Sequence, residues 1–183
     1  MVPAISLPAG IVLAAVLIAA VTDVWKFKVH NVLTLPLLLS GVAYHGVAGG
    51  LAGSVLGVLF GFASLILFYL LGGMGAGDVK LMAAVGAWLG MPATFFVFLA
   101  SALAAGLYAL VLIVAYGRVR ETWVNLQIVW HRLAAIGRHL GADDCVEAGA
   151  GRGDRRRRLI PFGAMVAVGI LTLLAWSWLR GTP

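Results

Sequence analysis

Long apolar runs separated by short polar or glycine-rich breaks make up most of this chain. Each long run approaches the roughly 20 residues that a helix needs to cross the hydrocarbon core of a bilayer. The runs are continuously apolar rather than alternating, which favours helices over a β-barrel. The pattern therefore predicts an all-α fold, a polytopic membrane bundle of about six transmembrane helices. The expected apolar helices cover residues 4–22, 31–48, 51–71, 79–91, 93–116 and 159–179.

The breaks between these runs predict where the helices end. We expect the first helix to end at Thr22, before the polar cluster that starts at Asp23. A glycine-rich loop over residues 72–78 is expected to separate the third run from a short apolar helix. That short helix is expected to stop at Met91, because Pro92 follows it and proline disfavours helix continuation.

The only extended polar region lies at about residues 117–158. Apolar residues recur there at three- and four-residue spacing up to Leu133, which predicts a helix lying in the membrane interface. Residues 141–158 are rich in Gly, Asp and Arg and are expected to form a flexible loop. We therefore predict one membrane-embedded domain, 1–183, with a cytoplasmic amphipathic and basic loop at about 117–158.

Composition supports a membrane location. Of the 183 residues, 62% are hydrophobic and 11% are charged, whereas soluble domains are about one quarter charged. The single cysteine, Cys145, allows neither an internal disulfide nor a Cys-based zinc site. Residues 1–10 contain no Lys or Arg, so we expect the first run to be a retained transmembrane helix rather than a signal peptide.

The distribution of basic residues predicts the orientation. If the N-terminus is outside and the spans alternate, every Lys and Arg except Arg180 faces the cytoplasm, as the positive-inside rule requires. The net charge of +6 is then explained by topology, and no nucleic-acid partner is needed. The run Arg155–Arg158 is expected to meet anionic lipid head groups.

Asp23 and Asp78 are the candidate catalytic residues. They are the only acidic residues before Glu121, and the predicted topology places both at cytoplasmic helix ends. A carboxylate at the edge of hydrocarbon is unfavourable and calls for an explanation. Asp78 could simply cap the following helix, and Asp23 could be solvated or paired with Lys26 or Lys28.

Taken together, the two carboxylates form a possible dyad. When two carboxyl groups approach closely, ionisation of both is disfavoured. The protonated group can donate to a substrate carbonyl oxygen while its partner takes a proton from an attacking water. Gly75 and Gly77 belong to a glycine cluster beside Asp78 that would permit close backbone approach by a peptide.

These residues resemble the type IV prepilin peptidase family, membrane aspartic peptidases of the GxGD class. The segment Gly72–Leu81 is similar to that family's second aspartate block, and Asp23 with Asn31 resembles the first. Ile160-Pro-Phe-Gly163 resembles the opening of the family's last span. The resemblance implies catalytic roles for Asp23 and Asp78, and a site-shaping or substrate-binding role for Asn31.

The same resemblance implies an endopeptidase that removes leader peptides from prepilins at the cytoplasmic face of the bacterial inner membrane. Val29-His30 stands where the family usually has Ile-Pro. The paired Cys-x-x-Cys motifs associated with N-methylation are missing, so the chain resembles the short, peptidase-only members of Flp/Tad-type pilus systems, and no methyltransferase activity is expected. Neither a metal nor another cofactor is expected.

Other interpretations remain open at this stage. Lys80 either holds a substrate group or contacts lipid phosphate. Small residues such as Gly57, Gly61 and Gly106 suit close helix packing. The substrate could be an archaellin-like or other membrane precursor. Alternatively, the chain could be a small ion- or proton-coupled transporter, although such proteins place ionisable groups near the bilayer midplane, or a non-catalytic assembly subunit.

Overall fold

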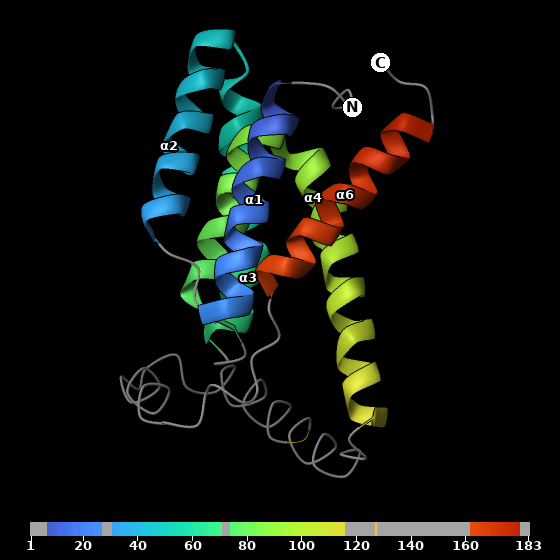
Figure 1. Ribbon diagram of the computed structural model, residues 1–183. Coiled ribbons are helices and arrows are strands. Elements are labelled where there is room, and N and C mark those ends of the chain that lie inside the picture. Colours follow the sequence, from blue (N-terminus) through green and yellow to red (C-terminus); the bar gives the residue numbers. More distant parts are fainter. Residues whose placement is uncertain (1–6, 27–30, 71–73, 116–126, 128–161, 180–183) are drawn as a thin grey trace, which may run out of the picture.

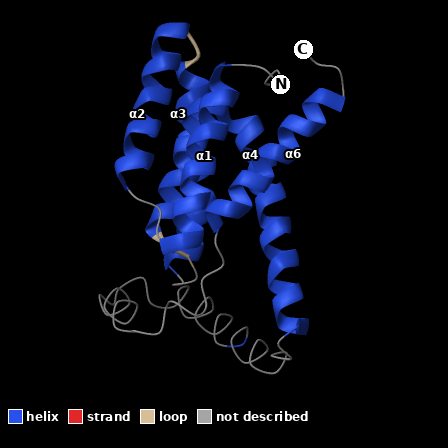
Figure 2. Ribbon diagram, in the orientation of Figure 1, coloured by secondary structure: helices blue, strands red, loops and turns tan. Residues whose placement is uncertain are grey.

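The structure is a computed structural model that describes residues 7–26, 31–70, 74–115, 127 and 162–179. Every regular element in these ranges is helical (Figure 2). The helices α3 (Leu51–Leu70), α4 (Ala76–Ala115) and α6 (Phe162–Leu179) are long and apolar enough to cross a membrane, and α1 (Leu7–Lys26) and α2 (Asn31–Ala48) contain shorter apolar stretches. The predicted all-α membrane bundle is therefore confirmed.

Helix α4 consists of two arms that meet at Gly90. This glycine has a left-handed backbone, with φ of 72°, which side chains with a Cβ rarely adopt. The first arm, residues 76–89, runs opposite to α3, since Gly86 meets Gly57 and Met82 meets Gly61. The second arm, residues 91–115, runs back along the other side of the bundle (Figure 1). The predicted break at Pro92 therefore falls at Gly90, where the backbone itself leaves the helix.

The break frees backbone carbonyls that neighbouring helices then satisfy. In a continuous helix, the carbonyl of Ala87 would accept the N–H four residues later, which here lies beyond the break at Gly90. The carbonyl of Trp88 would need the N–H of residue 92, which Pro92 lacks. The hydroxyl of Ser54 donates to the Ala87 oxygen over 2.7 Å. The ring Nε2 of His45 lies 2.9 Å from the Trp88 oxygen. An apolar surrounding without water requires such partners, so α2 and α3 fix the position of the break.

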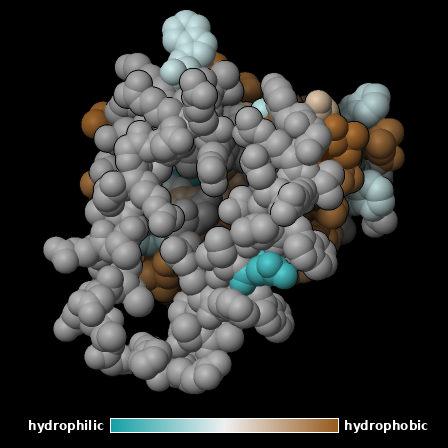
Figure 3. Space-filling view, turned by 90° about the horizontal axis from the view of Figure 1, so that it is seen from below, coloured by the Kyte–Doolittle hydropathy of each residue, from teal (hydrophilic) through white to brown (hydrophobic). Residues whose placement is uncertain are grey.

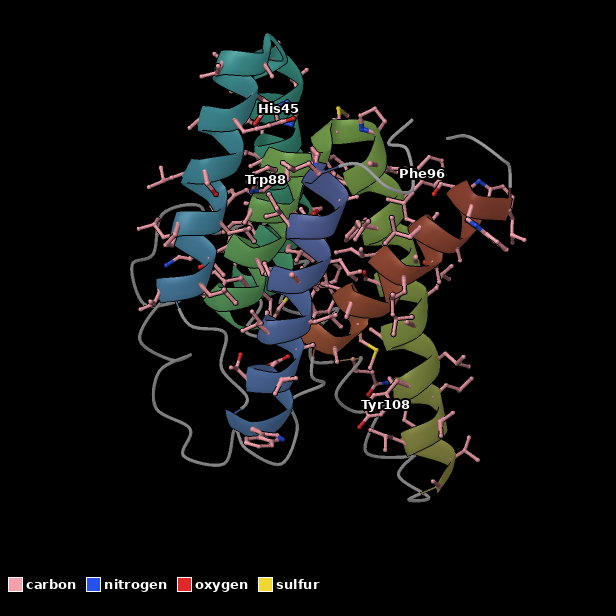
Figure 4. All side chains as sticks on the ribbon, turned by 45° about the horizontal axis from the view of Figure 1, so that its top comes forward. His45, Trp88, Phe96 and Tyr108 are labelled. Carbon is pink, nitrogen blue, oxygen red and sulfur yellow. The ribbon has the colours of Figure 1, made fainter. Side chains whose placement is uncertain are left out.

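Trp88 joins the first arm of α4 to α2. Its indole N–H donates to the carbonyl of Leu37 over 2.7 Å, and its ring stacks on Tyr44 with centroids 5.4 Å apart. His45 and Trp88 lie together at the α2–α4 boundary (Figure 4). His45 thus makes a structural contact between α2 and α4.

Two glycines let α3 and the first arm of α4 cross at backbone distance. A Cβ at Gly57 would collide with the Gly86 carbonyl, and one at Gly61 would collide with the Met82 carbonyl. The predicted packing role of both glycines is confirmed. For Gly106, no atom of the described residues lies within 4 Å of the place where its Cβ would stand, so the described helices do not use it for close packing.

The first arm of α4 forms the centre of the bundle, with Val79 and all of residues 81–89 buried. Side chains from α1, α3 and α6 complete the core around it, among them Val12, Val16, Leu65, Val166 and Ile170. Many large hydrophobic side chains lie exposed on the outside of the bundle, among them Val47, Leu103 and Val114, and Figure 3 shows brown, hydrophobic side chains at the left and right edges beside paler and teal ones. A buried centre and an apolar rim are what a helical bundle surrounded by lipid requires.

Candidate active site

Asp23 points into the bundle because it continues the buried stripe of α1. The stripe contains Val12, Val16 and Ala19, and Asp23 follows at the next helical step, four residues further on. Only 6% of Asp23 is exposed, whereas the neighbouring Trp25 is 81% exposed. The expectation that α1 ends at Thr22 is wrong. The helix continues to Lys26, and the Thr22 hydroxyl bonds back to the Ala19 carbonyl inside it.

The beginning of α6 holds the Asp23 carboxylate. The backbone N–H of Gly163 donates to Asp23 Oδ2 over 2.9 Å. The first N–H groups of a helix have no partner within it and favour an acceptor with negative charge. A Cβ at Gly163 would stand only 3.1 Å from the same oxygen, so glycine allows this close approach.

Asp78 lies in the first turn of α4, which begins at Ala76. Its Oδ2 accepts the N–H of Gly75 at 3.3 Å, and its own N–H donates to the Gly75 carbonyl at 3.2 Å. The side chain thus reaches back to the residue before the helix, as the acidic partner of a capping box does. The predicted glycine-rich loop is shorter than expected, because helix α4 already includes Gly77.

Asp23 and Asp78 both lie beside the start of α6. They come from the end of α1 and the start of α4, which are 55 positions apart in the chain. The start of α6 links them. Gly163 bonds to Asp23, while the adjacent Phe162 lines the same groove as Asp78. Three helix termini therefore meet at this pair of carboxyl groups.

The groove beside Asp78 has a volume of about 370 Å³ and is largely apolar, within the roughly 300–1,000 Å³ typical of ligand sites. Its walls come from α3, the second arm of α4 and the start of α6. Sequence reasoning missed this groove, although the small residues along α4 were a visible signal. The lining residues are Leu65, Phe68, Met74, Asp78, Phe98, Ala102, Ala105, Gly106, Ala109 and Phe162.

The other predicted site residues are Gly75, Gly77, Lys80 and Asn31. Gly75 contacts Asp78 directly, and Gly77 is half-buried in the first turn of α4. Lys80 follows Asp78 by two residues in α4 and is exposed, and its role stays a prediction. Asn31 begins α2, but its side chain lies outside the described residues. Within the described ranges, no group of three or more His, Cys, Asp or Glu side chains is placed to hold a metal ion.

Several sequence expectations concern residues that the structure does not describe. These are His30, the Ile160-Pro161 part of the last motif, the loop at about 117–158 apart from Gln127, and Arg155–Arg158 within it. They stay predictions.

Within the membrane bundle, Asp78 lines an apolar groove, and the start of α6 connects that groove to the Asp23 carboxylate. A sequence profile of the type IV leader peptidase family matches residues 10–110, more than half of the chain. The chain belongs to the type IV leader peptidase family. The matched range includes both aspartates, most of α1, all of α2 and α3, and most of α4.

Curated relatives carry the name prepilin leader peptidase/N-methyltransferase. The chain is 38% identical over 115 residues to one from Aeromonas salmonicida, covering 57% of this chain and 40% of that protein. It is 38% identical over 120 residues to one from Neisseria gonorrhoeae, covering 60% and 42%. It is 39% identical over 103 residues to one from Klebsiella pneumoniae, covering 51% and 45%. The match thus spans only about two fifths of the length of these relatives, and no solved structure matches the chain.

Proposed function

We propose that this protein is a membrane aspartic endopeptidase that removes the leader peptide from type IV prepilins. The observation that supports the proposal is that Asp78 lines an apolar groove next to the start of α6, which holds the Asp23 carboxylate, in a chain of the type IV leader peptidase family. The relatives' names include leader peptidase activity, and the family resemblance of the aspartate blocks assigns that chemistry to these two residues. The whole chain acts as one membrane-embedded peptidase domain.

The chemistry requires one protonated and one ionised carboxyl group. The ionised group takes a proton from a water molecule, whose oxygen attacks the scissile carbonyl carbon. The protonated group donates its proton to the carbonyl oxygen, giving a neutral tetrahedral diol. The C–N bond then breaks as one hydroxyl proton returns to a carboxylate and a proton passes to the leaving amine. The hydrogen bond from Gly163 holds Asp23 in place during this sequence.

We further propose that the site faces the cytoplasm in the bacterial inner membrane, with the N-terminus outside. The arrangement of Lys and Arg in the sequence supports this orientation. We infer an Flp-type substrate and no methyltransferase activity, because the chain has a single cysteine and lacks the paired Cys-x-x-Cys motifs. The Arg155–Arg158 run is proposed to contact anionic lipid, and Lys80 and Asn31 to shape the substrate site.

The test is cleavage of a prepilin precursor from the same genome, co-expressed with the protein and followed by a size shift on a gel. We expect conversion by the wild type and none by Asp23→Asn or Asp78→Asn at equal membrane levels. Asp143→Asn, the same chemical change in the polar loop, serves as the matched control and should cleave normally. Conversion by either site variant at the wild-type rate would reject the assignment.

A methyl-transfer assay on the cleaved product tests the second part of the proposal. Mass spectrometry of the mature N-terminus should show an unmodified amine when this protein is the only processing enzyme present. A mass increase of one methyl group that depends on this protein would contradict a peptidase-only activity.

A further inference from the structure

The second arm of α4 carries two different faces. Bulky side chains cover one of them, and Leu103 and Leu107 are 67% and 64% exposed, as expected of residues that contact lipid. The other face lines the groove with the small residues Ala102, Ala105, Gly106 and Ala109. They follow the i, i+3, i+4, i+7 spacing of a single helix face. This small face extends over about 10 Å, or two helical turns.

Ala105 at the edge of the small face packs against the core, but the part of the face around Gly106 is not used by packing between the described helices. Where α3 crosses the first arm of α4, a Cβ on Gly57 would collide with backbone. At Gly106, by contrast, no atom of the described residues lies within 4 Å of the Cβ position. Small residues on a membrane helix allow another helix backbone to approach closely. The face around Gly106 has this property and a groove in front of it, but no described helix lies against it.

The groove reaches Asp78 and the start of α6. Asp78 itself lines it, and so does Phe162, whose neighbour Gly163 bonds to Asp23. An occupant of the groove would therefore have one end beside the reacting groups. A lipid acyl chain would fill apolar space but has no group for a carboxyl pair to act on, whereas a peptide helix brings an amide bond to it.

We propose that this groove binds the apolar helix of the substrate, with the small face of α4 as its docking surface. The helix lies against Ala102, Gly106 and Ala109, and the chain segment at its end enters the space beside Asp78. This proposal rests on the proposed peptidase function and adds where the substrate binds. Close approach of two helices also makes Gly106 a determinant of specificity, because any larger side chain there holds the substrate backbone away.

The first test replaces Gly106 by Leu and compares Gly53→Leu as the matched control. Both glycines are in helices and have open space at the Cβ position, but Gly53 lies on α3 and does not line the groove. We expect Gly106→Leu to lower the initial rate of precursor cleavage at least tenfold, with Gly53→Leu within twofold of the wild type. Equal rates for all three proteins, or equal losses in both variants, would overturn the docking proposal.

The second test is disulfide crosslinking in membranes, which does not depend on activity. In a Cys145→Ser, Asp78→Asn background, Ala109→Cys is compared with Leu107→Cys, using a precursor with one cysteine in its apolar helix. A crosslink to the precursor from position 109 and not from position 107 is the expected result. Equal crosslinking from both positions, or crosslinking at position 109 only to a second copy of this chain, would overturn the proposal.

The two proposals can fail separately. If the Cys145→Ser protein with Asp78 intact cleaves no precursor, the proposed function itself is rejected. If it cleaves and the Gly106→Leu enzyme is equally fast, only the position of the substrate helix is rejected.

Discussion

Replacement of Gly163 by alanine probes how tightly the Asp23 carboxylate is positioned. The added Cβ would stand 3.1 Å from Asp23 Oδ2 and 3.3 Å from its Cβ, so Asp23 must retreat by a few tenths of an ångström. That movement lengthens the 2.9 Å bond from the Gly163 N–H. A hydrogen bond to a charged group contributes about 1.5–3 kcal/mol, and each ~1.4 kcal/mol of barrier is a factor of ten in rate.

We therefore expect Gly163→Ala to slow precursor cleavage about tenfold, which corresponds to loss of only part of that bond. The fold should not suffer, since alanine is favoured over glycine in a helix by about 1 kcal/mol. The assay is the initial cleavage rate divided by the amount of enzyme in the membrane, with Gly53→Ala as control at a site with open space. A wild-type rate, or a decrease fully explained by lower enzyme amount, would refute the positioning argument.

The remaining predictions concern the scaffold that supports the site. Gly57→Ala should lower the accumulated protein severely, because its Cβ collides with the Gly86 backbone where α3 and α4 cross; normal accumulation and melting would contradict this. Ser54→Ala should leave the buried Ala87 carbonyl without its donor and lower stability by about 1–3 kcal/mol, measured by unfolding in detergent; the exposed Ala52→Ser serves as control. His45→Ala should have a similar effect through the Trp88 carbonyl, and an unchanged transition in both variants would show that these carbonyls need no partner.

Much of the fold could be predicted from hydropathy. The bounds of α2 and the apolar character of the other helices follow directly from continuous apolar runs in the sequence. Helix ends were harder to predict. Asp23 looks like the end of a span in the sequence, yet α1 continues because a distant N–H at Gly163 satisfies the carboxylate. Gly90 breaks α4 two residues before the expected proline, since a positive φ ends the helix before the missing N–H of Pro92 takes effect.

The candidate site was predictable in its chemistry and not in its surroundings. Two isolated aspartates at matching depth indicate a carboxyl pair, and in the structure both lie beside the start of α6. The groove depends on how the second arm of α4 packs relative to α3 and α6, and no local sequence pattern predicts that packing. Gly106 shows the limit of prediction from the sequence. A small residue in a membrane helix predicts close packing, but the packing can be within the protein or with a partner.

The central claim, that Asp23 and Asp78 act as one catalytic unit, is tested most directly by single-turnover cleavage with Asp23→Asn, Asp78→Asn and the double variant. Residues that act as a unit are not additive, so each single change should lower the rate nearly as much as both together. The account predicts three equally inactive enzymes at normal membrane levels. A single variant with clear residual activity, and a double variant whose loss is the product of the two single losses, would contradict it.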